Sequence, residues 1–312
     1  MEVSPMAAEL TLGPNLFHWP AEMKLDFYNR IADESPVSTV YLGEVICSKR
    51  TPFFDDHHLD KVADRLERAG KKVVFCSFSE VVIKRERNLL REWAEQEGRD
   101  LEVNNTAALL YLKNKPHRIG ALLNVYNEDT MAYLHEQGAN HFALLPELPR
   151  AAVAKLGEKA AELGVGLEVQ VFGRASLALS ARCYHARAHA RTKDNCQFVC
   201  GEDLDGMTLK TMDEKPFLTV NGIQTLSYGY LYLMPDIEDL KSIGVTHYRV
   251  MPHTCDMIAV TRLFEDVLQG RMAPAEGDAK LRELGIEAPF VNGFYHGRSG
   301  HTWSDRAAAE LA

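Results

Sequence analysis

The sequence lacks any long hydrophobic run. No apolar stretch reaches the roughly 18 residues that a membrane-spanning helix requires. The first residues also lack the basic segment and following apolar segment of a secretory signal. These absences predict a cytoplasmic protein with no integral membrane segment.

The sequence also lacks an excess of basic residues. It has 35 Lys and Arg against 44 Asp and Glu in 312 residues, for a net charge of −9. Short basic runs such as residues 84–87 are interrupted by acids and are typical of a solvated helix face. Proteins that bind duplex nucleic acid usually carry a basic stripe. Nucleic acid is therefore not expected as a partner.

A glycine-rich phosphate loop is a third absence. No strand-like segment is followed by one, and Gly164-x-Gly166 precedes a strand-like segment instead. The chain thus shows no nicotinamide or flavin fingerprint. Its composition, 46% hydrophobic and 25% charged, is that of an ordinary globular protein long enough for one large core.

Short β-branched or apolar segments alternate with amphipathic ones along most of the chain. Residues 58–69 have apolar side chains at helical spacing and end before Gly70, a typical helix C-cap. Such alternation predicts parallel βαβ units. We expect an α/β fold, a (β/α) barrel-like single domain over residues 9–312 after a flexible tail at 1–8. Strands are expected at Glu9–Leu16, Thr39–Gly43, Lys72–Ser77, Leu101–Asn104, Arg118–Asn124, His141–Leu145, Gly166–Val171, Phe217–Asn221 and Thr246–Met251.

Three of the six cysteines are close together in the sequence. Cys183, Cys196 and Cys200 lie within residues 183–212, a charged segment without clear periodicity that predicts an irregular insertion between strands. Cytoplasmic thiols stay reduced, so clustered cysteines there more often bind a metal than form disulfides. Thiolates suit iron–sulfur clusters, zinc and copper(I).

A [4Fe–4S] cluster usually takes four cysteines, so a fourth ligand must come from elsewhere. Cys47 and Cys255 each follow a predicted strand, at the face where barrel strand ends gather, and spacing does not separate them. Cys76 falls in an apolar run and is expected to be a buried thiol. Structural zinc is the alternative. The paired C-x2-C motifs that are usual in structural zinc sites are absent from the sequence. His185 and His189 would be further zinc ligands, unless they are loop histidines exposed to water.

Polar residues at predicted strand ends are candidates for a site at the barrel mouth, where barrel enzymes place their chemistry. For each candidate, a hydrogen bond to backbone at a loop start is the competing interpretation. An ion pair of Glu44 with Lys49 or Arg50 is a further alternative, and those two cations would also offset the charge of a four-thiolate cluster. The candidates are Glu44, Asn104, Asn124, Glu147, Asn221, Gln224 and His253.

Several motifs resemble those of the collagenase-like (U-thirty-two) peptidase family. The similarity is to the branch of that family that acts in oxygen-independent ubiquinone biosynthesis, and it runs from near residue 12 to near residue 225, with a further match at residues 291–295. The motifs are Leu12-Gly13-Pro14 with Trp19-Pro20, the segment Tyr41–Arg50, Ser180-Ala181-Arg182-Cys183, Lys193-Asp194-Asn195-Cys196 with Cys200, and the segment Leu218–Thr225.

The resemblance implies a barrel-like protein whose [4Fe–4S] cluster is held by Cys47, Cys183, Cys196 and Cys200. It also ranks Glu44, Asn221 and Gln224 first among the catalytic candidates, because they lie inside shared motifs. One departure is informative. Ser176 stands where many members of the family have a cysteine. In this respect the sequence resembles the branch that takes its fourth cluster ligand from the position of Cys47.

The resemblance further implies an iron–sulfur subunit required, with a UbiU-type paralogue as heterodimeric partner, for oxygen-independent hydroxylation of ubiquinone precursors. A quinone precursor is then the expected substrate, and prephenate is the oxygen donor that the family suggests. A non-catalytic electron-transfer or structural partner of the UbiU-type chain is the alternative. A peptidase is a third hypothesis, but the sequence has neither a Gly-x-Ser-x-Gly elbow nor a His-Glu-x-x-His motif.

Overall fold

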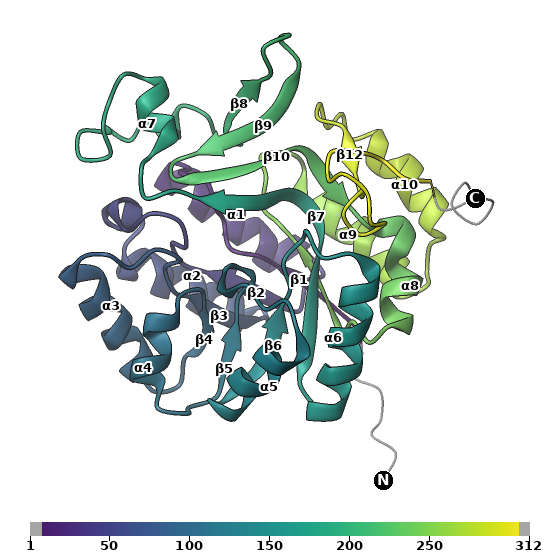
Figure 1. The fold of residues 1–312 in the computed structure, drawn as a ribbon, viewed down its shortest axis with the longest axis horizontal. Helices are drawn as coiled ribbons and strands as arrows, with labels where there is room; N and C mark the ends of the chain where they lie inside the picture. Colours follow the sequence, from purple (N-terminus) through teal and green to yellow (C-terminus); the bar gives the residue numbers. More distant parts are fainter. Residues whose placement is uncertain (1–7, 306–312) are drawn as a thin grey trace.

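The centre of the molecule is a closed barrel of parallel strands, seen in a computed structural model that describes residues 8–305. Strands β1 to β7 pair in chain order, and β11 closes the ring by pairing with both β7 and β1 (Figure 1). The predicted (β/α) barrel-like domain is therefore confirmed, while residues 1–7 of the expected tail lie outside the described part. The barrel strands are β1 (Glu9–Leu12), β2 (Thr39–Leu42), β3 (Lys72–Cys76), β4 (Asp100–Val103), β5 (His117–Ile119), β6 (Ala139–Ala143), β7 (Gly166–Leu179) and β11 (His247–Val250).

Helices lie between successive strands and cover the outside of the barrel. In α2, Leu59, Val62 and Leu66 are buried, as the helical spacing predicted, and the side chain of Asp55 caps its first turn by accepting from the His58 N–H at 3.2 Å. The helices of the barrel wall are α1 (Ala21–Glu34), α2 (Asp56–Arg68), α3 (Lys84–Glu95), α4 (Leu109–Leu112), α5 (Glu128–Glu136), α6 (Arg150–Leu163), α8 (Ile237–Ser242), α9 (Met257–Leu268) and α10 (Pro274–Arg282).

Strand β7 continues beyond the barrel and begins a second, antiparallel layer above the mouth. A bulge before Phe172 and the positive φ of Gly173 (110°) bend it, and a side chain at Gly173 would meet Met251 at 2.8 Å. In Figure 1 this layer crosses above the barrel strands. It pairs β7 with β10 (Gln224–Tyr232), β10 with β9 (Pro216–Asn221), and β9 with β8 (Met207–Lys210), while β12 (Phe290–Val291) pairs with β10.

The expectation of an irregular insertion was only partly right. The segment 183–212 contains helix α7 (Tyr184–Ala188), the 3-10 helix η4 (Val199–Gly201) and strand β8. The first and fifth predicted strands were too long. Strand β1 ends at Leu12 because Pro14 has no N–H to donate, and β5 gives way to a 3-10 turn before Asn124, whose φ is +61°.

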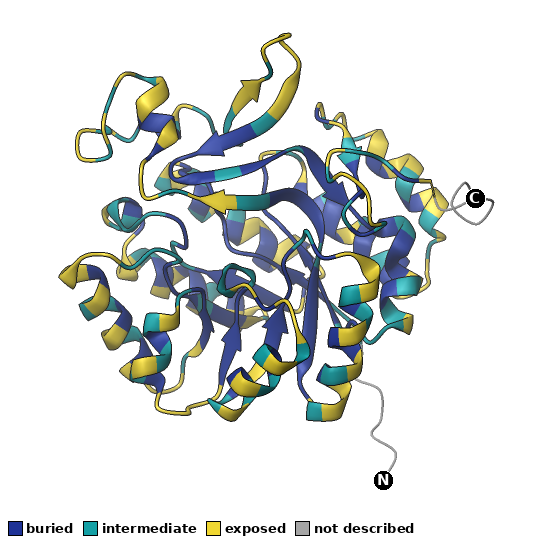
Figure 2. Cartoon of the chain, viewed as in Figure 1, coloured by how far each residue is buried: buried dark blue, intermediate teal, exposed yellow. Residues whose placement is uncertain are grey.

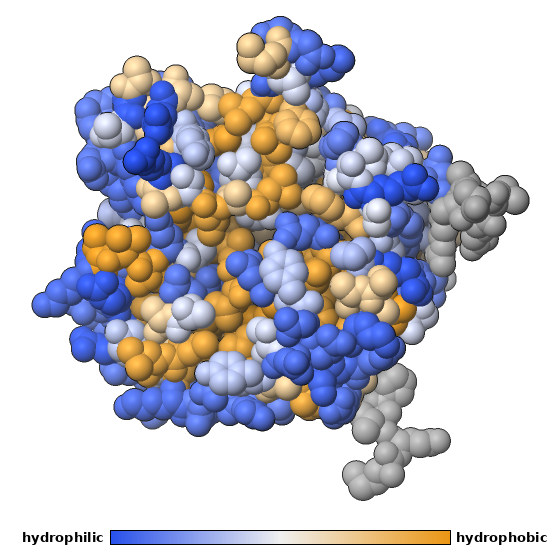
Figure 3. Space-filling model, viewed as in Figure 1, coloured by the Kyte–Doolittle hydropathy of each residue, from blue (hydrophilic) through white to orange (hydrophobic). Residues whose placement is uncertain are grey.

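Burial follows the layered plan of the chain. The barrel strands are buried on both faces, whereas the outer helices alternate buried and exposed turns (Figure 2). The β8–β9 hairpin and the end of β7 are exposed. Apolar side chains also gather across the middle of the face seen in Figure 3, around a hollow below the β7–β10 layer. The barrel mouth therefore lies between two packed layers.

Candidate iron–sulfur site at the barrel mouth

The Cys47 loop follows β2 and is shaped by a neighbouring carboxylate. Oε1 of Glu44 accepts hydrogen bonds from the backbone N–H groups of Ile46 and Cys47, both at 3.0 Å. Cys47 then begins the 3-10 helix η1 (Ser48–Phe53). Two backbone bonds to one side chain give the loop a single conformation, so the Cys47 thiol has a defined place above β2.

The other three predicted ligands come from the segment between β7 and β9. Cys183 precedes α7, and its Sγ accepts from the Ala186 N–H at 3.4 Å, while Cys200 lies in η4. Cys183 belongs to a buried apolar cluster, and Cys47 and Cys196 pack against the same cluster. The Cys200 sulfur is close enough to Cys183 for their charges to interact. The structure thus gathers the four predicted ligands, which are separated by as many as 153 positions in the chain.

The two remaining cysteines are engaged elsewhere. Cys76 is 2% exposed, and its thiol lies 3.6 Å from a carboxylate oxygen of Glu102 inside the barrel. Its expectation as a buried thiol is confirmed. Cys255 packs against the main core instead, with its Sγ 3.7 Å from the sulfur of Met257. The structure places Cys47, and not Cys255, beside the cysteines of the insertion.

Arg50 is the central cation of this site. It is 2% exposed, and its Nη1 donates to the Leu16 carbonyl at 3.1 Å. Its Nη2 donates to Oδ1 of Asn221 at 2.6 Å, and Nη1 lies 3.7 Å from the Glu44 carboxylate. The guanidinium also interacts with the sulfur of Cys200. A fixed positive charge therefore lies among the cysteines.

Burial and the charge of Arg50 shift the pKa of the neighbouring thiols in opposite directions. Burial raises the pKa of Cys47 to about 11 although the charge of Arg50 lowers it, and the pKa of Cys200 is raised by the same balance. Both thiols are therefore protonated at neutral pH in the free protein. A bound metal replaces the thiol proton, so cluster assembly would release protons here.

Two lysines join the Cys47 loop to the insertion. Nζ of Lys49 donates to the backbone carbonyls of Lys193 and Asp194, at 2.6 and 3.2 Å. Nζ of Lys193 in turn pairs with Glu80 at 2.6 Å, in the loop after β3. These bonds fix the segment between Cys183 and Cys196 against the loops at the barrel mouth.

The residues present fit a four-thiolate cluster. The donors are sulfurs only, and the Nε–H of the neighbouring Arg50 is buried without a hydrogen-bond partner. Four cysteine thiolates are the usual ligand set of a [4Fe–4S] cluster.

The three first-ranked catalytic candidates surround this site as structural supports. Nδ2 of Asn221 donates to the carbonyls of Cys200 and Asp203, both at 3.0 Å. Nε2 of Gln224 donates to the Leu16 carbonyl at 2.8 Å, and Glu44 holds the Cys47 loop. The structure brings all three together, and each one positions backbone near the cysteines.

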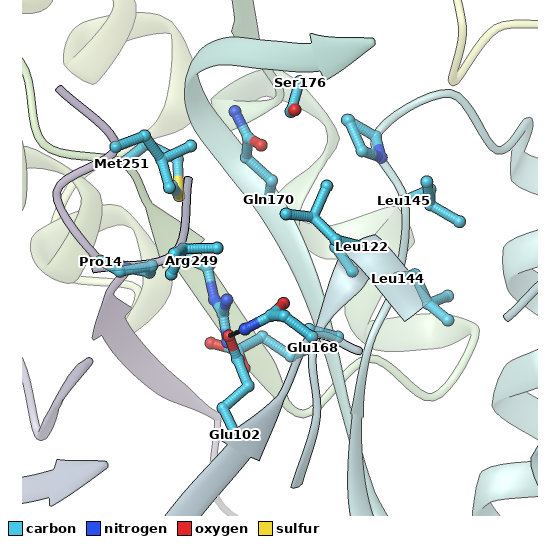
Figure 4. Close-up of a pocket in the computed structure, with 16 residues that line it drawn as sticks. Pro14, Glu102, Leu122, Leu144, Leu145, Glu168, Gln170, Ser176, Arg249 and Met251 are labelled. Carbon is cyan, nitrogen blue, oxygen red and sulfur yellow. Dashed lines mark hydrogen bonds and ion pairs between the residues drawn. The ribbon is translucent and has the colours of Figure 1, made fainter. Parts of the chain in front are cut away.

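A pocket at the barrel mouth (Figure 4) shares lining residues with the apolar cluster around Cys183. Glu102, Glu168 and Arg249 form its polar end, where Nη2 of Arg249 lies 2.5 and 2.7 Å from the two carboxylates. Nε of Arg249 and Oγ of Ser176 are buried and have no hydrogen-bond partner among residues 8–305. Its apolar walls are Pro14, Leu16, Val45, Leu122, Leu144, Leu145 and Met251, of which Leu16, Val45 and Met251 also belong to the apolar cluster around Cys183.

The sequence analysis did not predict this polar network, because its residues lie inside the strands and not at strand ends. Tyr41 donates to Glu168 at 2.6 Å, and His141 Nε2 lies 2.8 Å from the same carboxylate. Burial alone would raise the pKa of Glu168, but Arg249 and His141 hold it well below its usual range. The available signal was a charged or polar residue inside otherwise apolar strands, at Tyr41, Glu102, Glu168 and Arg249.

The other strand-end candidates serve local structure. Asn104 bonds to Ser77 and lines the pocket, and His253 accepts from the Arg174 N–H at 3.0 Å. Asn124 ends a 3-10 turn with a left-handed backbone, and Glu147 accepts from the Tyr126 hydroxyl. A hydrogen bond to backbone, the competing interpretation, is present for His253 and for Asn104, whose Nδ2 donates to the Ser77 carbonyl at 3.4 Å, whereas Glu147 bonds to a side chain.

The fold and the site define a class, a (β/α) barrel with four cysteines gathered over its mouth. The family model described as "Peptidase family U32" matches residues 22–305. The chain therefore belongs to peptidase family U32. In the part of the chain that the structure describes, no helix is long and apolar enough to cross a membrane.

Solved structures resemble the barrel only distantly. The spore cortex-lytic enzyme SleL of Bacillus megaterium shares 12% identity and a TM-score of 0.42, over 84% of this chain and 74% of that one. SleL of Bacillus cereus shares 10% and 0.42, over 86% and 76%. The DAHP synthase of Thermotoga maritima shares 11% and 0.41, over 90% and 71%. Likenesses of this degree carry no information on chemistry.

Proposed function

We propose that this protein is a UbiV-type iron–sulfur subunit that acts with a UbiU-type paralogue in oxygen-independent hydroxylation of ubiquinone precursors. The observation that carries the proposal is the gathering of Cys47 with Cys183, Cys196 and Cys200 beside the barrel pocket. The sequence motifs around the same four residues support it.

The site divides the work between its residues. Cys47, Cys183, Cys196 and Cys200 hold a [4Fe–4S] cluster, which supplies one-electron chemistry when bound. Arg50 offsets the negative charge of the thiolates, and Cys183 and Cys200 are buried while Cys47 and Cys196 are half-buried. Hydrogen bonds and burial of this kind set a cluster's reduction potential.

The pocket is the proposed binding place for the quinone precursor. Its apolar walls suit a substituted aromatic ring, and the unpaired Nε–H of Arg249 and the hydroxyl of Ser176 are available to a polar substituent. Because the pocket and the cysteines share Leu16, Val45 and Met251, a ring bound there lies next to the cluster site.

A heterodimer with the UbiU-type paralogue would cover exposed apolar side chains. Val82 and Ile83, at the start of α3, are 59% and 53% exposed, and Leu110 on the adjacent α4 is 74% exposed. Contiguous exposed apolar patches mark protein-binding surfaces, and we propose that these three side chains lie in the interface.

The proposal is tested in cells. A strain without this protein should make normal ubiquinone in air, where oxygen-dependent hydroxylases act, and should fail to make it without oxygen. A chain with Cys183→Ala should not restore anaerobic synthesis, because three thiolates hold a cubane poorly. Quinone extraction and mass spectrometry from paired cultures measure both. Normal anaerobic ubiquinone in the deletion strain, with no duplicate gene, would refute hydroxylation.

A second candidate function is a non-catalytic electron-transfer or structural partner of the UbiU-type chain. It is favoured by the supporting roles of Glu44, Asn221 and Gln224, which leave the chain without an evident acid or base among them. Ala121→Phe separates the two functions by filling the pocket while leaving the cysteines intact. Hydroxylation by the reconstituted pair should stop if this chain binds substrate. It should continue if the chain only transfers electrons. Ala107→Phe, in a short 3-10 helix outside the pocket, is the control.

The peptidase hypothesis would need a nucleophile such as Cys76, Cys255 or Ser227, and the surroundings of these three residues do not support it. Burial raises the pKa of Cys255 to about 12 and that of Cys76 well above its usual range. The hydroxyl of Ser227 donates to the Gly229 carbonyl at 2.6 Å and accepts from the Ala175 N–H. None is an activated nucleophile, which requires an aligned base.

A further inference from the structure

Two histidines and a carboxylate converge beside the cysteine loop. His185 and His189 are four residues apart around α7, and their rings stack with centroids 5.5 Å apart and planes 6° from parallel. Asp203 follows η4. One ligand atom from each residue lies within 4.8 Å of the other two. Side chains four apart share a helix face, a spacing that suits two ligands of one metal ion.

The hydrogen bonds of His185 define which ring nitrogen is free. Its side chain is fully buried, and Nδ1 lies 3.2 Å from the Val220 carbonyl oxygen. A carbonyl only accepts, so Nδ1 carries the hydrogen and donates it. In the neutral imidazole Nε2 then presents its lone pair. The expectation that this histidine is an exposed loop residue is wrong.

The lone pair of His185 faces another acceptor. Nε2 lies 3.0 Å from Oδ2 of Asp203, and it has no hydrogen-bond partner of good geometry. The imidazole of His185 is fully buried, whereas the side chain of Asp203 is 35% exposed. Two acceptors in contact at the edge of a buried site are unfavourable unless a positive species lies between them. A metal ion shared by the imidazole and the carboxylate satisfies both, and His189 adds a third ligand.

We propose that His185, His189 and Asp203 bind a divalent first-row metal ion, zinc or ferrous iron. Imidazole and carboxylate ligands suit both ions, and three protein ligands leave a coordination position open to water or a small ligand. The Val220 carbonyl acts as the outer partner that orients the imidazole of His185, as is usual for metal-bound histidines.

The proposed metal site uses none of the cysteines as a ligand. Two of its ligands are nevertheless close to cysteines in the sequence. His185 lies two residues after Cys183, and Asp203 lies three residues after Cys200. Asn221 donates to the carbonyls of both Cys200 and Asp203. A bound ion would therefore brace the segment that carries three of the four proposed cluster ligands. This consequence depends on the proposed cluster, whereas binding of the ion does not.

The test uses the full chain, purified anaerobically and compared at equal iron and sulfide content. Zinc is added in equilibrium dialysis and counted by mass spectrometry. We expect about one zinc per chain beyond the cluster metal. His189→Ala and Asp203→Asn should each weaken zinc binding at least about tenfold, with iron and sulfide unchanged. His58→Ala is the matched control, because His58 also pairs with a carboxylate (Asp55, 2.6 Å) but no third ligand lies near that pair in residues 8–305.

The outcomes distinguish this inference from the proposed function. Absence of the additional zinc, or equal zinc binding by His189→Ala and the parent chain, would overturn the inference. A chain that contains no iron or sulfide but binds zinc through His189 and Asp203 would support it while refuting the cluster. The side chain of His189 lies at the end of the short α7 and is less embedded than that of His185, so its variant tests binding without a buried cavity.

Discussion

Nη2 of Arg50 donates a 2.6 Å hydrogen bond to Oδ1 of Asn221, and this contact joins the Cys47 loop to the hairpin beneath Cys200. Both residues are buried. The amide of Asn221 is thus fully used, with its oxygen on the guanidinium and its nitrogen on two backbone carbonyls. The pair explains how loops far apart in the sequence present their thiols to one place.

Asn221→Ala should loosen this connection. It leaves a buried N–H of Arg50 and two carbonyls unpaired, at a cost of about 1–3 kcal/mol. We expect faster loss of iron to a chelator under anaerobic conditions. Asn127→Ala is the control, because Asn127 caps α5 away from the cysteines, so its loss should reduce stability by about 1 kcal/mol without changing iron loss. Equal iron loss in both variants would show that Asn221 has no special role.

The proposed ligands predict a pattern among the cysteine variants. Cys47→Ala, Cys183→Ala, Cys196→Ala and Cys200→Ala should each lose most bound iron, measured with sulfide content and EPR spectra under anaerobic conditions. Cys76→Ala and Cys255→Ala should keep it, because their sulfurs contact Glu102 and Met257 instead. Loss of iron in Cys255→Ala but not in Cys47→Ala would reverse the assignment of the fourth ligand.

Gly222 at the β9–β10 turn provides a test of the space around Arg50. Its φ is +66°, and a Cβ there would lie 2.4 Å from Nη2 of Arg50. Gly222→Ala should therefore destabilise the protein through both backbone strain and displacement of Arg50. Gly70→Ala has similar strain (φ +79°) but nothing within 4 Å, so it isolates the backbone cost of about 1–2 kcal/mol. Unfolding midpoints and iron content should fall further for Gly222→Ala. Identical behaviour of the two variants would contradict this.

His141 should make the stability of the fold depend on pH. Burial lowers its pKa to about 4, although the Glu168 carboxylate opposes the shift. In the unfolded chain the pKa of His141 is near 6.5. Between pH 6.5 and 4 the unfolded state therefore binds a proton that the folded state does not bind. The contribution of neutral His141 to the free energy of unfolding is therefore fully present above pH 6.5 and is lost as the pH falls towards 4. Between pH 7.5 and 5.5 the loss is about 1.3 kcal/mol for this residue.

Urea unfolding of His141→Gln at these two pH values measures that contribution. The variant should lose about 1.3 kcal/mol less than the parent chain over the same interval. His57→Gln, at an exposed position on α2, should retain the dependence of the parent chain. An unchanged pH dependence in His141→Gln would show that another group is responsible.

The proposed partnership predicts a heterodimer in anaerobic ultracentrifugation with the UbiU-type paralogue. Val82→Asp and Leu110→Asp should weaken it, because a charge placed in an apolar interface loses its water without gaining a partner. Met212→Asp, at a fully exposed position on the β8–β9 hairpin, should have little effect. A chain that remains monomeric in the presence of the paralogue would count against the partnership.

The alternation of short apolar and amphipathic segments was sufficient to predict the barrel. This pattern is local, since a helix buries every third or fourth residue and a buried strand is apolar throughout. It placed α2, predicted at residues 58–69, within two residues of its observed bounds and most barrel strands within a few residues. It missed β10 and the second half of β7, because antiparallel pairing above the mouth depends on the bend at Gly173 and not on a periodic signal.

The site required contacts between distant segments. Spacing left Cys47 and Cys255 equal, and closure of the barrel placed only Cys47 beside Cys183. Position at a strand end nominated Glu44, Asn221 and Gln224, but their hydrogen bonds make them supports of the cysteine loops. Local residue patterns therefore determine which elements form and which residues can bind metal. Closure of the barrel determines which of those residues meet. Burial and charge depend on distances in space, and separation along the sequence does not specify these distances.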